Sequence, residues 1–112
     1  MAINKTVFIT GGAKRIGLAT AKYLHDEGYN IIISYNKSNK DAKKIFTELN
    51  SYRQNSCQII KIDFLSIKDY ESISKKIIKF FGRVDVLVNN ASIFYPTQIN
   101  KINEKNWHDI ID

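Results

Sequence analysis

The stretch that decides the fold runs over residues 6–17 and reads Thr-Val-Phe-Ile-Thr-Gly-Gly-Ala-Lys-Arg-Ile-Gly. Its apolar start predicts a buried strand, and the two glycines that follow lead directly into a helical pattern. Backbone N–H groups at such a turn, together with the dipole of the next helix, favour an anion above it. Glycine also lets a ligand approach the backbone closely, and Arg15 adds a permanent cation. We therefore expect a phosphate-bearing nucleotide at this turn. The candidate contacts are Gly11, Arg15, Ile16 and Gly17.

Other glycine-rich motifs fit the same turn less well. Gly12 and Gly17 have the spacing of a P-loop, but Leu18 and Ala19 follow where a lysine and a hydroxyl residue are required. Without them the turn cannot hold a γ-phosphate and Mg²⁺, which disfavours a nucleoside triphosphate hydrolase. The Gly-x-Gly-x-x-Gly form is not met either. A glycine-rich helix entry that binds no ligand is the plain alternative.

Apolar and amphipathic segments alternate along the rest of the 112 residues. The pattern predicts further strands at 31–33, 59–62 and 84–88, and helices at 14–27, after 38, after 66 and at 104–112. Strands that alternate with helices imply a parallel sheet with right-handed crossovers, which is a doubly wound fold of the α/β class. No linker or repeat divides the chain, so we expect one domain over residues 1–112 that ends within its fourth helix.

Local patterns predict how the helices begin and end and which side they bury. Ser38-x-x-Asp41 and Ser66-x-x-Asp69 resemble capping boxes at the starts of the second and third helices. Gly28 follows the first helix as a C-terminal stop. The residues expected on the buried side of the first helix are Ile16, Thr20, Tyr23 and Leu24.

Composition narrows the function classes. The net charge is +6, but the lysines fall within amphipathic helical patterns and the aromatic residues fall mostly on apolar positions, so nucleic-acid binding is not expected. No apolar run has the length of a membrane span, and the first residues lack the features of a secretory signal, so a cytoplasmic protein is expected. Cys57 is the single cysteine, and no Cys/His cluster has metal-ligand spacing. His25 and His108 stand alone on helical segments, where we expect surface positions.

In a doubly wound sheet, ligands bind beyond the carboxyl ends of the strands. The segment after the second strand, Tyr35-Asn36-Lys37-Ser38, has no acid that could accept from the ribose hydroxyls of NAD. Lys37 together with Arg15 instead suggests the 2′-phosphate of NADP. Ser38 could contact that phosphate, cap the next helix, or do both.

The end of the third strand carries a second pair of candidates. Asp63 and Phe64 suit an adenine amino group and the edge of its ring. The plain alternative for Asp63 is a turn residue.

The fourth strand ends in Asn89-Asn90-Ala91-Ser92, which resembles the Asn-Asn-Ala-Gly signature of the short-chain dehydrogenase/reductase superfamily. Thr10, Gly11 and Gly17 are similar to that family's Thr-Gly-x-x-x-Gly-x-Gly turn. Arg15 and Ser92 stand where the family has glycines. These departures, with the segments at 35–38 and 92–96, resemble the pteridine reductase branch.

The resemblance implies a Rossmann-type sheet with strand order 3-2-1-4 and an NADPH-dependent reductase of a pterin or another carbonyl compound. It implies cofactor contacts at Asn90, Ala91 and Ser92. It also implies that Ser92 and Phe94 contact the substrate, with the aromatic ring stacked on a pterin. Another carbonyl or 3-ketoacyl reductase is the alternative within the family.

The family's catalytic pair is a tyrosine with a lysine four residues later, where the ammonium lowers the pKa of the phenol for proton transfer. None of the six tyrosines in the sequence has a lysine at that spacing. We therefore assign no catalytic residue and expect the cofactor-binding portion of a reductase. A non-catalytic nucleotide-binding or interaction module is the alternative. The family's strand order also leaves residues 86–88 along a strand at the side of the sheet, which predicts that the chain self-associates through this strand or folds only marginally.

Overall fold

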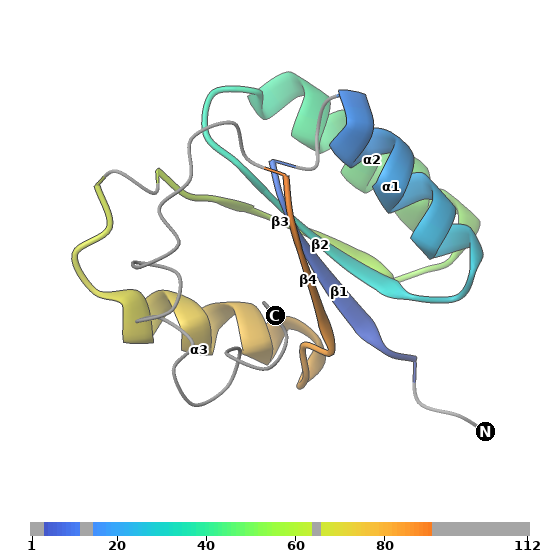
Figure 1. Cartoon of the computed structure of the whole chain (residues 1–112). Helices are drawn as coiled ribbons and strands as arrows, with labels where there is room; N and C mark the ends of the chain where they lie inside the picture. The colour runs from blue at the N-terminus through green and yellow to red at the C-terminus, as the bar shows by residue number, and fades with distance from the viewer. Residues whose placement is uncertain (1–3, 12–14, 64–65, 91–112) are drawn as a thin grey trace.

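The computed structural model of the protein describes residues 4–11, 15–63 and 66–90 (Figure 1). Strands and helices alternate along it, as the sequence pattern predicts. The elements in chain order are β1 (Thr6–Thr10), α1 (Arg15–Asp26), β2 (Asn30–Tyr35), α2 (Asn39–Tyr52), β3 (Cys57–Lys61), α3 (Tyr70–Phe81) and β4 (Val86–Asn89). The helix expected at 104–112 lies outside the described residues.

The four described strands form one parallel sheet in the order β3-β2-β1-β4, which confirms the predicted α/β class and strand order. β1 is an inner strand, and its Val7 lies opposite Ile31 on one side and Val86 on the other. Because all the strands run in the same direction, their carboxyl ends meet at one edge of the sheet.

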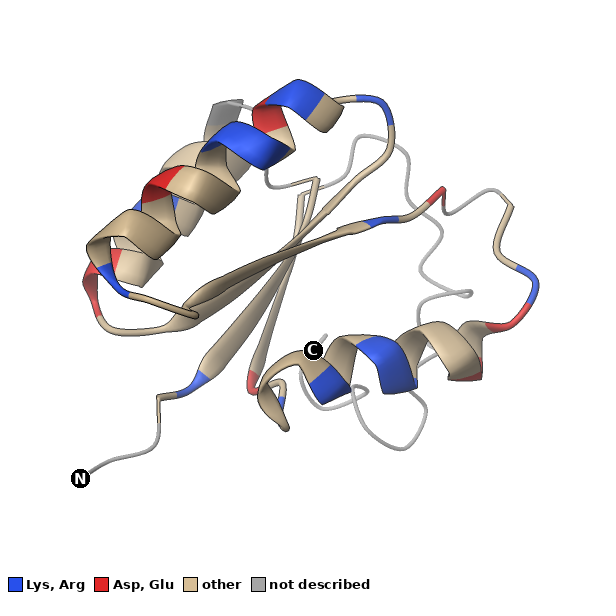
Figure 2. Cartoon of the chain, turned by 180° about the vertical axis from the view of Figure 1, so that it is seen from behind, with Lys and Arg blue, Asp and Glu red and all other residues tan. Residues whose placement is uncertain are grey.

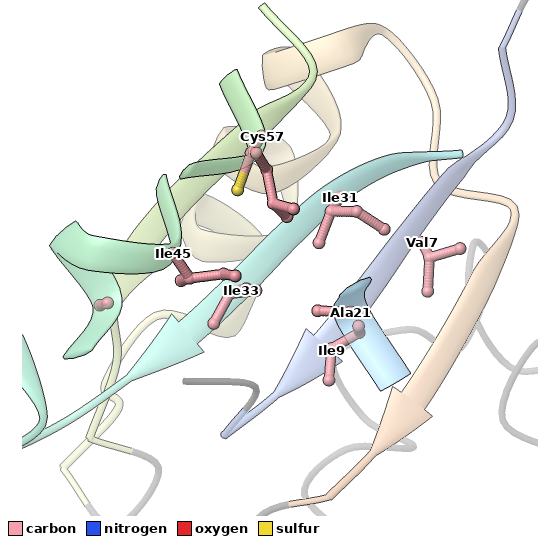
Figure 3. Packing of buried hydrophobic residues seen from close by; sticks show 9 residues of the cluster. Val7, Ile9, Ala21, Ile31, Ile33, Ile45 and Cys57 are labelled. Carbon is pink, nitrogen blue, oxygen red and sulfur yellow. The ribbon is translucent and has the colours of Figure 1, made fainter. Parts of the chain in front are cut away.

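Each face of the sheet is covered by helices. Figure 1 shows α1 and α2 on one face and α3 on the other. Alternate residues of a strand point to opposite faces, so the first core takes one set of positions and the second core takes the other. The first buried cluster contains Val7, Ile9, Ala21, Ile31, Ile33, Ala42, Ile45, Leu49 and Cys57 (Figure 3). The second contains Phe8, Ile32, Ile60, Ile62 and Ile77. Burial on both faces explains why the strands read as continuous apolar runs.

The buried side of α1 differs from the expected one. Ile16 is 73% exposed and Tyr23 is 65% exposed, whereas Ala21 is fully buried against the first core. Gly17 is buried as well, and Leu24 packs against the core as expected. Small residues on the inner side let the helix approach the sheet closely, so α1 is rotated away from the side that Ile16 and Tyr23 indicate.

The helix ends also correct part of the prediction. Ser38 occupies the N-cap position of α2, but its side chain makes no cap hydrogen bond. Helix α3 is capped by Asp69, whose carboxylate accepts the Ser72 N–H at 3.0 Å. Ser66 is therefore not the cap. Its hydroxyl donates to Asp63 Oδ2 at 3.0 Å instead.

Gly28 ends α1 as expected. It has a φ of +101°, which favours glycine. Its N–H donates to the His25 carbonyl at 3.0 Å, and the Tyr29 N–H donates to the Leu24 carbonyl at 3.1 Å. This pair of hydrogen bonds is a Schellman motif, and it turns the chain into β2.

His25 is buried, contrary to the surface position expected from the sequence. Its ring Nε2 lies 2.7 Å from Ser56 Oγ. Burial, followed by the charge of Arg53, lowers the pKa of the imidazole, although Asp26 opposes the shift. Arg53 also donates to the His25 carbonyl at 3.0 Å and to the Tyr29 carbonyl at 2.5 Å. These contacts join the ends of α1 and α2 to the start of β2.

Hydrogen bonds of Asp85, the residue before β4, fix that strand to the amino end of β1. Asp85 Oδ2 accepts the Thr6 N–H at 2.8 Å, and the Asp85 N–H donates to the Thr6 carbonyl at 2.8 Å. Both oxygens of the Asp85 carboxylate accept from Arg83 as well. The Arg83 hydrogen bond is the main cause that lowers the pKa of Asp85, and burial acts in the opposite direction.

Candidate nucleotide-binding site

The turn after β1 lies at the carboxyl edge of the sheet and contains Gly11. This residue has a φ of +64°, in the left-handed region where a side chain is strained. Its N–H donates to Ser34 Oγ at 3.1 Å, and its carbonyl accepts from Asn90 Nδ2 at 3.5 Å. The N–H and the carbonyl of Gly11 are thus both held by side chains from neighbouring segments.

A second set of hydrogen bonds joins the ends of β1 and β4. The Thr10 hydroxyl donates to Asn89 Oδ1 at 2.9 Å, and the same hydroxyl oxygen accepts the Asn90 N–H at 2.8 Å. Thr10 is buried. The Thr-Gly and Asn-Asn segments, singled out separately in the sequence, therefore form one network.

The segment after β2 lies at the same edge. Tyr35 is the last residue of the strand and packs against the first core, while Asn36 and Lys37 are exposed. The Ser38 carbonyl accepts the Ala42 N–H at 2.9 Å, which begins α2. An exposed ammonium thus stands beside the start of a helix, where the helix dipole also favours an anion.

Asp63 follows β3 directly beside this segment. The Ile62 N–H donates to the Tyr35 carbonyl at 2.8 Å, which extends the pairing of β2 and β3 up to Asp63. One carboxylate oxygen of Asp63 accepts from the Ser66 hydroxyl, and its carbonyl accepts the Ser66 N–H at 2.9 Å. Asp63 therefore does shape the local turn, and its contact with an adenine remains a prediction.

Arg15, Ile16 and Gly17 form the first turn of α1, where Ile16 is exposed and Gly17 is buried. Phe64, Ala91, Ser92 and Phe94 lie outside the described residues.

The sequence analysis did not select Ser34, which contacts Gly11 in the structure. The sequence does contain a sign of it, because Ser34 is a polar residue that directly follows the three isoleucines of β2.

The described side chains place further limits on the site. No group of three His, Cys, Asp or Glu residues among them could hold a metal ion. Burial raises the pKa of the Cys57 thiol to about 12, which keeps it protonated.

Lys and Arg residues are spread over helices and loops on both sides of the sheet (Figure 2). In residues 4–11, 15–63 and 66–90, no helix has the length and apolar character that a membrane crossing requires.

Comparison of the sequence with known proteins identifies the family that it matches. The model of the family described as short chain dehydrogenase matches residues 5–112. The 3-oxoacyl-(acyl-carrier-protein) reductase FabG of Staphylococcus aureus strain Mu50 is 30% identical over 112 residues, which are 100% of this chain and 45% of that protein. Pteridine reductase 1 of Leishmania tarentolae is 33% identical over 108 residues, with 81% of this chain and 37% of that protein covered. The acetoacetyl-CoA reductase of Paracoccus denitrificans is 32% identical over 111 residues, with 96% and 42% covered. The chain spans less than half the length of these relatives.

Proposed function

The chain belongs to the short-chain dehydrogenase family, and on this premise we propose that it is the cofactor-binding portion of an NADPH-dependent oxidoreductase. The observation that carries the proposal is the left-handed turn at Gly11, held between Ser34 and Asn90 at the carboxyl edge of a parallel sheet. A dinucleotide would place its pyrophosphate over such a turn, at the start of the helix that follows. The turn and α1 supply binding and orientation, and the cofactor supplies the hydride.

The preference for NADP(H) rests on the segment after β2. Lys37 is exposed there, and residues 35–38 contain no acid that would accept from the ribose hydroxyls of NAD. Ser38 makes no cap hydrogen bond, so its hydroxyl can turn toward a 2′-phosphate. Arg15 in the first turn of α1 is the second cation assigned to that phosphate.

For the substrate we propose a pterin or another small carbonyl compound. The similarity to a pteridine reductase supports a pterin, with Ser92 and Phe94 as the substrate contacts. The similarity to two reductases of 3-oxoacyl and acetoacetyl compounds supports a 3-ketoacyl substrate as the alternative. We propose a cytoplasmic protein in either case.

Lys37→Ala should weaken NADPH binding about tenfold to a hundredfold and leave NADH binding nearly unchanged. The reason is the loss of a charge-assisted contact, which contributes roughly 1.5–3 kcal/mol. Calorimetric titration of both cofactors measures it. Lys44→Ala is the matched control, because Lys44 is also an exposed lysine but lies beyond the first turn of α2. Equal affinity of the unmutated protein for NADPH and NADH would refute the proposed preference.

We also propose that the chain self-associates through β4. Among the described strands β4 pairs with β1 alone, and Val86 is 37% exposed. Unpaired N–H and C=O groups along an apolar strand recruit other chains. Val86→Lys should shift the mass measured by light scattering toward the monomer. Tyr23→Lys adds the same charge on α1 and should leave the mass unchanged; a monomeric unmutated chain at high concentration would contradict the proposal.

A further inference from the structure

Ser34 breaks the apolar run of β2 at its carboxyl end, and its side chain is only 2% exposed. Burying a hydroxyl costs free energy unless the hydroxyl is hydrogen-bonded. The pattern of the strand leads one to expect an apolar residue here, because the neighbouring residues Ile31, Ile32 and Ile33 all belong to the two cores. A hydrogen-bond partner of the Ser34 hydroxyl must therefore account for a polar residue at this buried position.

The register of the sheet shows where Ser34 stands. It lies opposite Ile60 of β3, and Ile33 lies opposite Ile9 of β1. The next position along β1 is Thr10, whose hydroxyl is bonded to the end of β4. Ser34 and Thr10 thus form one polar row at the carboxyl edge, directly above the apolar positions of the core.

The partner of Ser34 is the backbone of the predicted nucleotide-binding turn. Its Oγ accepts the Gly11 N–H at 3.1 Å, while Asn90 donates to the Gly11 carbonyl. Gly11 has a φ of +64°. A glycine adopts positive and negative φ values about equally readily, so its own preference does not fix this conformation. Ser34 from β2 and Asn90, the residue after β4, therefore hold Gly11 in one orientation at the start of the turn.

We propose that Ser34 is a positioning residue that holds this turn ready for the dinucleotide. The inference rests on the proposed function for its effect on binding. Ser34 is followed directly by Tyr35 and the segment assigned to the 2′-phosphate, so it connects the two segments that the cofactor would contact. A turn that is already oriented loses less conformational freedom when a ligand binds, and this strengthens binding.

The test compares Ser34→Val with Ser34→Thr. These variants have the same shape and the same branch at Cβ, and they differ by a methyl group in place of the hydroxyl. We expect Ser34→Val to bind NADPH about tenfold more weakly than Ser34→Thr. We also expect the Gly11 amide hydrogen to exchange with solvent about tenfold faster in Ser34→Val. The Ile32 amide in the core of β2 should exchange at the same rate in both variants, which separates a local effect from global destabilisation.

The outcomes are distinct. Equal exchange of the Gly11 amide in the two variants would overturn the inference, and so would faster exchange with unchanged NADPH affinity. If the unmutated protein binds neither NADPH nor NADH, the proposed function fails, while the exchange rates still show whether Ser34 holds the turn. Should the extra methyl group prevent folding, Ser34→Ala against the unmutated protein gives the same comparison.

Discussion

Thr10→Val should lower the free energy of unfolding by about 2–4 kcal/mol. The substitution keeps the shape of the side chain but removes the hydroxyl that joins Asn89 Oδ1 to the Asn90 N–H. The Asn90 N–H is then left without this partner, and an unsatisfied buried group costs about 1–3 kcal/mol, whereas the exposed Asn89 loses a hydrogen bond that contributes about 0.5–1.5 kcal/mol. For a domain of this size the loss corresponds to a fall in Tm of about 10–20 °C.

Thermal unfolding of Thr10→Val and Thr10→Ser measures this effect. The serine variant retains the hydroxyl and loses a methyl group, so it separates the hydrogen bonds from packing. We expect Thr10→Ser to lie much closer to the unmutated protein. If the serine and valine variants are equally destabilised, the hydrogen bonds of the Thr10 hydroxyl do not account for the loss of unfolding free energy.

A preparation of these 112 residues should oxidise NADPH no faster than the buffer blank when dihydrobiopterin or acetoacetyl-CoA is supplied. No tyrosine in the sequence has a lysine four residues later. Proton transfer by a positioned acid contributes about 10²–10⁴-fold to a reaction rate, and that contribution is missing here. The consumption of NADPH is followed by its absorbance.

The control for this experiment is cofactor binding in the same preparation. A chain that binds NADPH and shows no turnover behaves as a cofactor-binding portion or as a non-catalytic binding module. A turnover of about one per second, which lies in the range of ordinary enzymes, would contradict the prediction if it survived repurification. It would require a proton donor other than the paired tyrosine and lysine.

The strands were predictable because both faces of the sheet are buried. A strand covered on two sides must be apolar throughout, and residues 7–9 and 31–33 show this directly. The orientation of α1 was not predictable in the same way. Ile16 and Tyr23 suggest one buried side, but the buried positions of α1 are Gly17, Ala21 and His25. The partner that allows His25 to be buried, Ser56, lies 31 residues away in the sequence.

The candidate site residues were chosen from their places at the strand ends, and their contacts with a ligand stay predictions. Gly11 and Asn90 were chosen from two separate motifs, and in the structure the Asn90 side chain donates to the Gly11 carbonyl. Ser34 was overlooked because a serine at the end of a strand is ordinary in sequence, and only the hydrogen bond to Gly11 gives it a role. The roles of Lys37 and Asp63 depend on a ligand, so their positions at the strand ends are established here while their contacts stay predictions.

The placement of β4 beside β1 has a consequence for the order in which the chain assembles. Thr10 and Asn89 are 79 residues apart in the sequence, whereas β1 pairs with β2 across a single helix. Proteins are synthesised from the amino end, so β1, β2 and β3 leave the ribosome before β4 does. Closing the longer loop also costs more entropy, and contacts of large sequence separation slow folding. The hydrogen bonds that join Asn89 and Asn90 to Thr10 and Gly11 can therefore form only after β1, β2 and β3 have been synthesised. The candidate nucleotide site therefore gains the contacts of Asn89 and Asn90 only with β4, the last of the described strands, and these contacts report that β4 has paired with β1.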